Sequence, residues 1–214
     1  MELNELLSHL PFVEGHRSVT NGVEHNTPYH TFPYQGVNVL GLRENARRLQ
    51  LLRSAVDEHV LVKESILDIG CNLGTIGAAF TNIFPTVVGV DEDHAILALA
   101  ERVYPLVHFQ RLALNQERLL QRFNHGEFQV TLCLSMLEYV NDKAAFVADL
   151  HQITRRLCIV EGHSEDFARG RDVEYEAILR TMPWTVTRLS ETTDPGMNAP
   201  KESRGRPVWV CVKS

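Results

Sequence analysis

Residues 65–80 read S-I-L-D-I-G-C-N-L-G-T-I-G-A-A-F, and this stretch decides the expected fold. A short apolar strand ends at Asp68. A turn with Gly70 and Gly74 follows, and a helix then begins whose first turns carry Gly77. Glycine lets a chain turn sharply and leaves no Cβ in the way of a ligand. Since ligands of open α/β sheets bind just beyond the carboxyl ends of the strands, the stretch predicts a site for a polar cofactor.

The chain around this stretch alternates between apolar strands and helices. Strands are expected at 64–69, 86–91, 106–111, 128–135 and 157–161, with helices at 74–83, 93–103, 115–122 and 142–155. Such short, almost wholly apolar strand runs are typical of parallel strands that are covered on both faces. A further helix at 171–181 and two strands, W-T-V-T-R-L-S and P-V-W-V-C-V-K, complete the chain. The alternation predicts an α/β fold with a parallel sheet and right-handed crossovers.

The N-terminal part of the chain has a different character. Residues 1–36 show little periodicity, and we expect a short helix followed by a long irregular segment. From Arg43 to about Val60, apolar residues recur at spacings of three and four, which predicts a helix with one apolar face. We expect residues 1–42 to form a cap over the main domain, residues 43–214. The arginines that fall mostly off the apolar face are expected in solvent: Arg43, Arg47, Arg48 and Arg53.

Composition narrows the class of protein. The chain has 214 residues, enough for one domain with a full core, and a formal net charge of -6, which argues against nucleic acid as the main partner. It lacks an apolar run of about 18 residues, so no membrane span is expected. The start, M-E-L-N-E-L-L, is acidic where a secretory signal would be basic, which favours the cytoplasm. The four scattered cysteines are expected to be buried free thiols.

A glycine-rich turn occurs in several cofactor classes, so the alternatives must be compared. The dinucleotide fingerprint G-x-G-x-x-G can be aligned in two registers, and neither fits. The register that begins at Gly70 requires a glycine where the chain has Asn72, and the other register would itself begin at Asn72. A phosphate loop of the type G-x-x-x-x-G-K-[ST] is absent from the sequence. His25 and His30 are five residues apart without a nearby acidic cluster, so no metal site is expected.

The sequence L-D-I-G-C-N-L-G resembles motif I of class I S-adenosylmethionine-dependent methyltransferases, usually written D-x-G-x-G-x-G, with Asn72 at the middle glycine. V-V-G-V-D, V-T-L-C-L-S-M-L-E-Y-V and L-C-I-V-E-G-H resemble the second, fourth and fifth strands of that family. The resemblance covers about residues 60–213. It implies a Rossmann-like, doubly wound, mostly parallel seven-stranded sheet with a terminal antiparallel strand. It also implies S-adenosylmethionine as cofactor and S-adenosylhomocysteine as product.

The resemblance also implies which residues hold the cofactor. Asp91 would bind the ribose hydroxyls, although it could instead cap the helix that follows, as could Asp93. Asp68 would hold the turn and the methionine end. The acid that family members often carry after the third strand is missing near Ala113, where a backbone group or Asn115 could substitute. The expected contacts in the main domain are Asp68, Gly70, Cys71, Asn72, Gly74, Asp91, Glu92, Leu112, Ala113, Leu114, Ser135 and Met136.

Two more segments are expected at the cofactor or the acceptor. In related small methyltransferases, an N-terminal segment covers the cofactor, which nominates Tyr34, Gln35 and Arg43 as further contacts. The loop 190–206 would leave the sixth strand on the cofactor side, where Arg204 and Arg206 could face an acidic acceptor.

Candidate bases for methyl transfer lie where the fourth and fifth strands end. They are Glu138, Tyr139, Glu161 and His163, and the catalytic set that we favour is His163, Glu138 and Tyr139. The unperturbed pKa of a histidine suits proton removal at neutral pH, although His163 could equally be an ordinary loop histidine. Glu138 and Glu161 could instead orient the acceptor or the ammonium group of the donor.

The expected function is methyl transfer to an oxygen or nitrogen atom of a small-molecule acceptor. The acidic net charge, the single domain and the absence of a nucleic-acid module favour this function. Three alternatives stay open at this point: a methyltransferase acting on RNA or protein, an NAD-dependent oxidoreductase, and a non-catalytic protein that binds S-adenosylmethionine. The sequence leaves the acceptor and the oligomeric state open.

Overall fold

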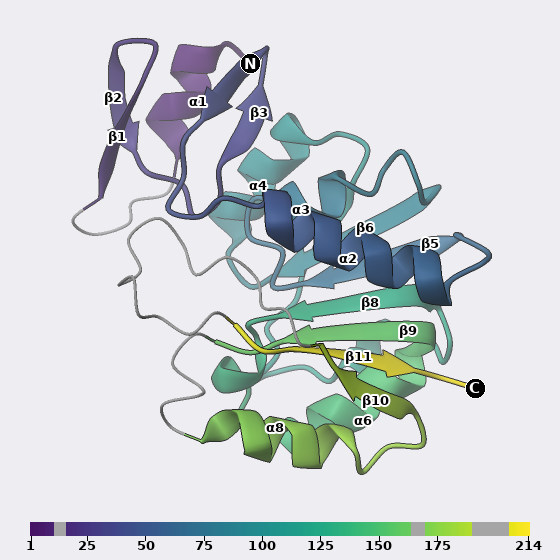
Figure 1. Cartoon of the computed structure of the whole chain (residues 1–214). Coiled ribbons are helices and arrows are strands. Elements are labelled where there is room, and N and C mark those ends of the chain that lie inside the picture. The colour runs from purple at the N-terminus through teal and green to yellow at the C-terminus, as the bar shows by residue number, and fades with distance from the viewer. Residues whose placement is uncertain (11–15, 164–169, 190–205) are drawn as a thin grey trace.

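A computed structural model describes residues 1–10, 16–163, 170–189 and 206–214. Its centre is a seven-stranded sheet with the strand order β10-β11-β9-β8-β5-β6-β7. The strands are β5 Ser65–Ile69, β6 Thr86–Asp91, β7 His108–Arg111, β8 Phe128–Leu134, β9 Thr154–Glu161, β10 Thr185–Arg188 and β11 Val208–Val212. Strands β5 to β9 pair in parallel, whereas β11 runs antiparallel to both β9 and β10 (Figure 1). The predicted α/β fold with a terminal antiparallel strand is confirmed.

Helices cover both faces of the sheet, with α2 and α3 on one and α5, α6 and α8 on the other (Figure 1). Their bounds are α1 Leu3–His9, α2 Ala46–His59, α3 Thr75–Ala78, α4 His94–Val103, α5 Leu119–Arg122, α6 Lys143–Ile153 and α8 Arg171–Leu179, with a 3₁₀ turn η1 at Leu137–Tyr139. Because neighbouring residues of a strand point to opposite faces, Ile66 packs toward α2 while Leu67 packs toward α6.

The helices α3 and α5 are much shorter than the sequence predicts. After Ala78 the chain continues in turns, in which Phe80 N–H donates to the Gly77 carbonyl and Ile83 N–H donates to the Phe80 carbonyl, both at 2.9 Å. The other helix, α5, begins only at Leu119, because Gln121 accepts a hydrogen bond of 2.8 Å from the backbone N–H of Arg118 and so caps the helix there.

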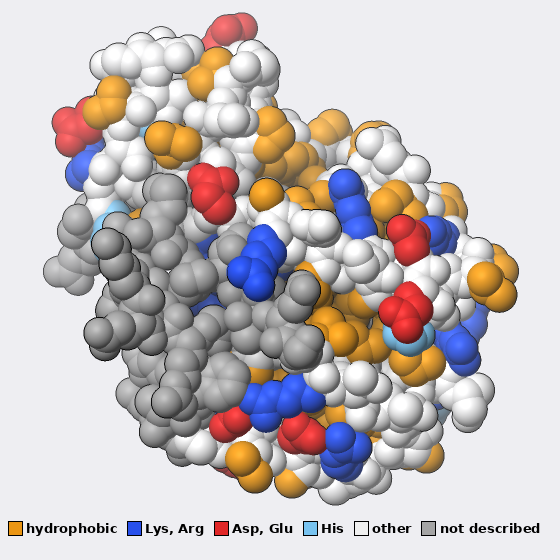
Figure 2. All heavy atoms as spheres, viewed as in Figure 1, with side chains coloured by type: hydrophobic (Ala, Val, Ile, Leu, Met, Phe, Trp, Pro, Cys, Tyr) orange, Lys and Arg blue, Asp and Glu red, His pale blue; other side chains and the backbone are white. Residues whose placement is uncertain are grey.

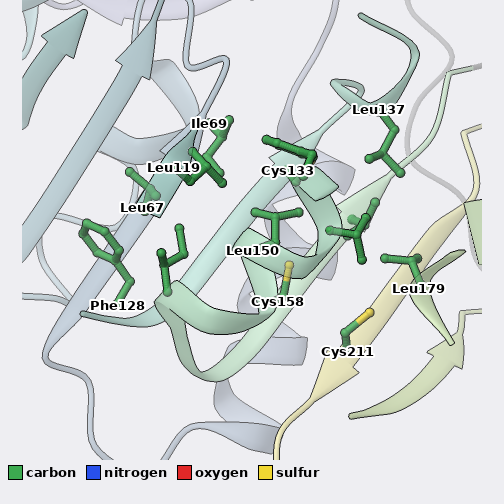
Figure 3. Close-up of a cluster of buried hydrophobic side chains, with 14 of the residues drawn as sticks. Leu67, Ile69, Leu119, Phe128, Cys133, Leu137, Leu150, Cys158, Leu179 and Cys211 are labelled. Atoms are coloured by element: carbon green, nitrogen blue, oxygen red, sulfur yellow. The ribbon is translucent and has the colours of Figure 1, made fainter. Parts of the chain in front are cut away.

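The cysteines behave as predicted. Cys133, Cys158 and Cys211 are fully buried and lie among the apolar side chains of one core cluster (Figure 3). Cys71 is also buried, and all four thiols are free. Burial raises the pKa of the Cys158 thiol to about 12, so this group stays protonated and acts as a small apolar side chain. Within the described residues, we find no helix with the length and apolar character needed to cross a membrane.

The N-terminal segment is more ordered than predicted. Instead of an irregular stretch it forms two β-hairpins, with strands β1 Arg17–Thr20, β2 Val23–Asn26, β3 Phe32–Tyr34 and β4 Val37–Val39. Asn21 and Gly22 join the first pair with φ of 50° and 80°, the left-handed conformation that a two-residue hairpin turn requires. Phe32 and Leu6 pack with Leu99 of α4, so the segment lies against the main domain. The division at residue 42 stays a prediction.

Candidate functional site

A cavity of about 470 Å³ lies where the sheet meets the N-terminal segment. Its walls come from the loops after β5, β6, β7, β8 and β9, from Arg48 of α2, and from Tyr29, His30 and Arg43 of the N-terminal segment. The cavity therefore occupies the carboxyl edge of the parallel strands, the place that the sequence predicts. Arg206, which precedes β11, closes the same cavity.

The loop after β5 is held by backbone geometry that glycine and asparagine tolerate best. The N–H groups of Gly70 and Cys71 both donate to the Val90 carbonyl, at 2.8 and 3.0 Å. Gly70 has a φ of 70°, and a Cβ there would lie 2.1 Å from the Met136 sulfur. Asn72 has a φ of 52°, which explains why asparagine can stand where the family usually has glycine.

Asp68 is buried beneath this loop, with 3% of its surface exposed. Its Oδ2 accepts a hydrogen bond of 3.1 Å from the Gly77 N–H, so it fixes the start of α3. Burial raises the pKa of Asp68 to about 7, against the opposing effects of Arg48 and the Gly77 N–H. Asp68 therefore gains and loses its proton near neutral pH, while lining the cavity.

This shifted pKa predicts how stability depends on pH. The folded protein binds the Asp68 proton more tightly than the unfolded chain does. The stability that this proton contributes is therefore complete below about pH 4 and is lost as the pH rises to about 7. Between these limits the wild type should lose about 4 kcal/mol of unfolding free energy relative to Asp68→Asn, which keeps an acceptor for Gly77. Urea unfolding of both proteins across this range measures the difference, and a constant difference would contradict the prediction.

Asp91 ends β6 and faces the loop after β5. Its Oδ2 accepts from the Asn72 N–H at 2.9 Å, and its Oδ1 accepts from the Asp93 N–H at 3.1 Å. The cap of α4 is Asp93, whose Oδ1 accepts from the N–H groups of Ala95 and Ile96. Asp91 is therefore not the helix cap, and since each carboxylate oxygen can accept a further bond, it offers two acceptors to the cavity.

The wall beyond β7 is mostly apolar. Leu112 and Leu114 line the cavity, whereas Ala113 between them does not. Asn115 also lines it, but its side chain is engaged with the loop after β8, donating to the Tyr139 carbonyl at 2.8 Å and accepting from the Asn141 N–H at 2.9 Å. Because the Asn115 side chain is engaged elsewhere, this wall offers mainly the two leucine side chains, which suit a flat apolar group rather than a charged one.

A buried ion pair lies at the inner end of the cavity. Arg48 donates from Nε and Nη2 to the two carboxylate oxygens of Glu161, at 2.9 and 2.6 Å, with 3% and 0% of the two residues exposed. The expectations that Arg48 is solvated and that Glu161 is a candidate base are therefore wrong. Burial alone would raise the pKa of Glu161, but Arg48, Arg206 and Arg43 hold it below its ordinary value, so Glu161 stays ionised.

Aromatic and basic side chains surround this pair. His30 Nε2 lies 3.0 Å from Arg48 Nη1, and since arginine can only donate, this nitrogen accepts and His30 is neutral. Burial and the charges of Arg48, Arg43 and Arg206 lower the pKa of His30, which keeps it neutral. The Tyr29 hydroxyl accepts from Arg43 Nη1 at 3.3 Å and from Arg206 Nη2 at 3.1 Å. Burial raises the pKa of Tyr29, but Arg206 and Arg43 outweigh it and lower the pKa.

The candidate bases lie on the loops that follow β8 and β9. His163 Nε2 is 3.6 Å from Glu138 Oε1, and Glu138 Oε2 is 3.4 Å from Arg171 Nη2. His163 lines the cavity, whereas Glu138 lies behind it and does not. Tyr139 lines the cavity with 60% of its surface exposed, and burial of its ring together with Glu138 raises its pKa.

Most residues nominated from the sequence meet at this cavity. Those that line it are Asp68, Gly70, Cys71, Asn72, Asp91, Glu92, Leu112, Leu114, Ser135, Met136, Arg43, Tyr139 and His163. Gly74 and Ala113 do not line it. Tyr34 and Gln35 are also absent from its lining, because their side chains donate to the Met1 carbonyl at 2.5 and 3.0 Å and tie the N-terminus to the β3–β4 hairpin. Arg204 lies outside the described residues.

Among the polar and charged lining residues, sequence reasoning missed three: Tyr29, His30 and Arg48. A signal for Arg48 was present, because it lies four residues before Leu52 and eight before Val56, on the buried face of α2. No comparable periodicity marks Tyr29 or His30, which lie between the two N-terminal hairpins.

Residues 67–159 match a family model described as a methyltransferase domain. Over this part, the chain resembles a methyltransferase domain. Ubiquinone biosynthesis O-methyltransferases of Pseudomonas paraeruginosa and Azotobacter vinelandii are each 31% identical to this chain, over 106 and 103 residues. Each match covers 47% of this chain and 44% of the relative, so the chain spans less than half the length of the curated relatives that it matches.

Solved structures confirm the fold of the methyltransferase domain. An S-adenosylmethionine-dependent methyltransferase from Mesorhizobium loti is similar with a TM-score of 0.61 and 17% identity, over 78% of this chain and 98% of that one. A TehB-like methyltransferase from Corynebacterium glutamicum gives 0.56 and 15%, over 79% of this chain and 96% of that one. The sheet around the cavity is therefore that of class I methyltransferases.

Proposed function

We propose that this chain is an S-adenosylmethionine-dependent methyltransferase that transfers a methyl group to an oxygen or nitrogen atom of a small-molecule acceptor. The observation that carries the proposal is Asp91, whose carboxylate faces the glycine turn after β5 and the cavity together. A carboxylate at the end of the second strand of such a sheet is the group that binds the hydroxyls of a nucleoside ribose. On a methyltransferase domain, that nucleoside is the methyl donor.

The residues present fit this donor. The backbone of Gly70 lies so close to Met136 that a side chain at this position would fill the space. The loop therefore stays open to a ligand only when glycine stands here. Asp91 would bind the ribose, and Leu112 and Leu114 would contact the adenine. Asp68 would bind the ammonium group of the methionine end and Arg43 would bind its carboxylate. Both residues line the cavity, and each has the charge opposite to that of the group it would bind.

When bound, the donor supplies an electrophilic methyl group together with its own leaving group. The chain then has to hold an acceptor in line and remove a proton where the acceptor is an alcohol or phenol. His163 is the base in this proposal, because it lines the cavity. Glu138, 3.6 Å away, would stabilise the imidazolium that forms and so positions His163 rather than touching the acceptor.

Several observations support a small-molecule acceptor. The cavity volume of about 470 Å³ lies in the range of ordinary small-molecule sites, about 300–1,000 Å³. The face seen in Figure 2 carries interspersed acidic and basic side chains. The curated relatives are named for O-methyl transfer, which favours oxygen. We include in this proposal that residues 1–42 cap the cavity, as Tyr29 and His30 support, and that the protein works in the cytoplasm, as its free thiols support.

Calorimetric titration tests the proposal. S-adenosylmethionine and S-adenosylhomocysteine should bind with micromolar affinity, and NAD should not compete. Tight binding of NAD without binding of either sulfur nucleoside would instead favour an oxidoreductase. Formation of S-adenosylhomocysteine with a panel of phenols and amines then separates an enzyme from a protein that only binds the donor.

Gly70→Ala should weaken donor binding about tenfold or more, because the added Cβ would push Met136 into the cavity. The matched control is Gly126→Ala, since Gly126 has a similar φ of 62° but no atom of the described residues lies within 4 Å of its would-be Cβ. Both variants should lose about 1–2 kcal/mol of stability from backbone strain. Titration of each with S-adenosylhomocysteine measures the difference, and equal affinities would show that the glycine serves the turn alone.

A further inference from the structure

Three buried arginines gather at the inner end of the cavity. Three arginines line it with at most 4% of their surface exposed: Arg43, Arg48 and Arg206. Both oxygens of Glu161 are engaged by Arg48, and Arg206 Nη1 lies 3.6 Å from the nearer one. Buried charges persist in proteins when they are paired, and the carboxylate nearest to Arg206 is already engaged by Arg48, so Arg206 can accommodate a further anion.

Arg206 shows where that anion belongs. Its Nη1 donates to Ser135 Oγ, and its Nη2 donates to the Tyr29 hydroxyl at 3.1 Å. Both acceptors are neutral hydroxyls, and a carboxylate would accept the same hydrogen bonds more strongly. Its Nε is buried and has no hydrogen-bond partner among the described residues. Arg206 is thus a guanidinium that lines the cavity with one donor unused.

The donor by itself does not balance this charge. Its methionine end has one carboxylate but also an ammonium and a sulfonium, so it adds positive charge on balance. In the arrangement proposed above, Arg43 takes the donor carboxylate. Arg206 then remains with Tyr29, whose hydroxyl accepts from both arginines and can donate its own proton to an anion.

We propose that the methyl acceptor carries an anionic group, a carboxylate or a phosphate, which binds to Arg206 and the Tyr29 hydroxyl. This inference rests on the proposed function and adds the substrate class. The anion would anchor the acceptor at Arg206 and Tyr29, while His163 lines the same cavity from the loop after β9. The acceptor is therefore an acid that also carries a nucleophilic oxygen or nitrogen atom.

The test uses the whole chain saturated with S-adenosylhomocysteine, so that the donor site is occupied. Benzoate, phenyl phosphate and the neutral analogue benzamide are titrated in parallel by calorimetry. We expect at least one anion to bind about tenfold or more tightly than benzamide, as expected for a charge-assisted pair. The tighter of the two anions tells a carboxylic acid from a phosphate ester. Equal affinity for all three probes, or no binding of either anion, overturns the proposal.

Variants assign the preference to Arg206. Arg206→Met should lose the preference for the anion and keep its S-adenosylhomocysteine affinity within about threefold, and Arg206→Lys should keep part of the preference. Arg47→Met, at an exposed position of α2, should change neither. If Arg206→Met retains the anion preference, or if Arg206→Lys loses donor and anion binding together, Arg206 does not anchor the acceptor. Failure of the wild type to bind S-adenosylhomocysteine would instead refute the proposed function.

Discussion

Replacing Arg48 with methionine should lower the free energy of unfolding by about 3–5 kcal/mol, which corresponds to a fall in Tm of roughly 6–20 °C. The substitution keeps an apolar side chain of similar length but removes both hydrogen bonds to Glu161, which has no exposed surface. A carboxylate left in that position has lost its main partner and cannot reach water. Arg206 remains 3.6 Å away, so the loss should lie toward the lower end of the range.

The matched control for this prediction is Arg47→Met, one residue earlier in the same helix. Arg47 is exposed, so its loss should change stability by less than about 0.5 kcal/mol. Thermal and urea unfolding of both variants measure the difference, at a pH where Glu161 is ionised. A similar effect of the two substitutions would mean that the buried pair adds nothing over ordinary solvated charge.

Asp91→Asn should weaken binding of S-adenosylmethionine about 10- to 150-fold, equivalent to about 1.5–3 kcal/mol. Each carboxylate oxygen of Asp91 already accepts one backbone N–H, from Asn72 and from Asp93. An asparagine offers one oxygen and one NH₂ group, so it opposes one of those backbone donors and has no charge for the ribose hydroxyls. The loop after β5 and the ribose contact should therefore weaken together.

The control for Asp91 is the same substitution two residues later. Asp93 caps α4 through Oδ1 alone, and an asparagine caps a helix as well as an aspartate, so Asp93→Asn should leave both Tm and donor affinity close to the wild type. Calorimetry with the donor and a thermal scan of each variant provide the comparison. Should Asp91→Asn bind the donor as tightly as Asp93→Asn does, Asp91 would not be the ribose ligand.

Local patterns made much of the fold predictable. Apolar strand runs and the helices between them depend on the few residues around each position, so β5, β6, β8 and α4 lie within a residue or two of their expected places. The first N-terminal hairpin was also predictable in principle, because Asn21-Gly22 is a strong signal for a two-residue turn. Its neighbouring turn at Gln35-Gly36 is a weaker signal, since glutamine rarely adopts its φ of 48°.

The places of the glycine turn after β5 and of Asp91 at the end of β6 were thus predictable from the sequence alone, because they follow from strands, a turn and a helix that are close together in the chain. The tertiary structure decided the inner end of the cavity. Arg48 and Glu161 are 113 residues apart, and Tyr29 and Arg206 are 177 apart, so no local pattern relates them. Whether an arginine is solvated or buried depends on which carboxylate the folded chain brings to it, and that pairing exists only once β9, α2 and the N-terminal segment meet.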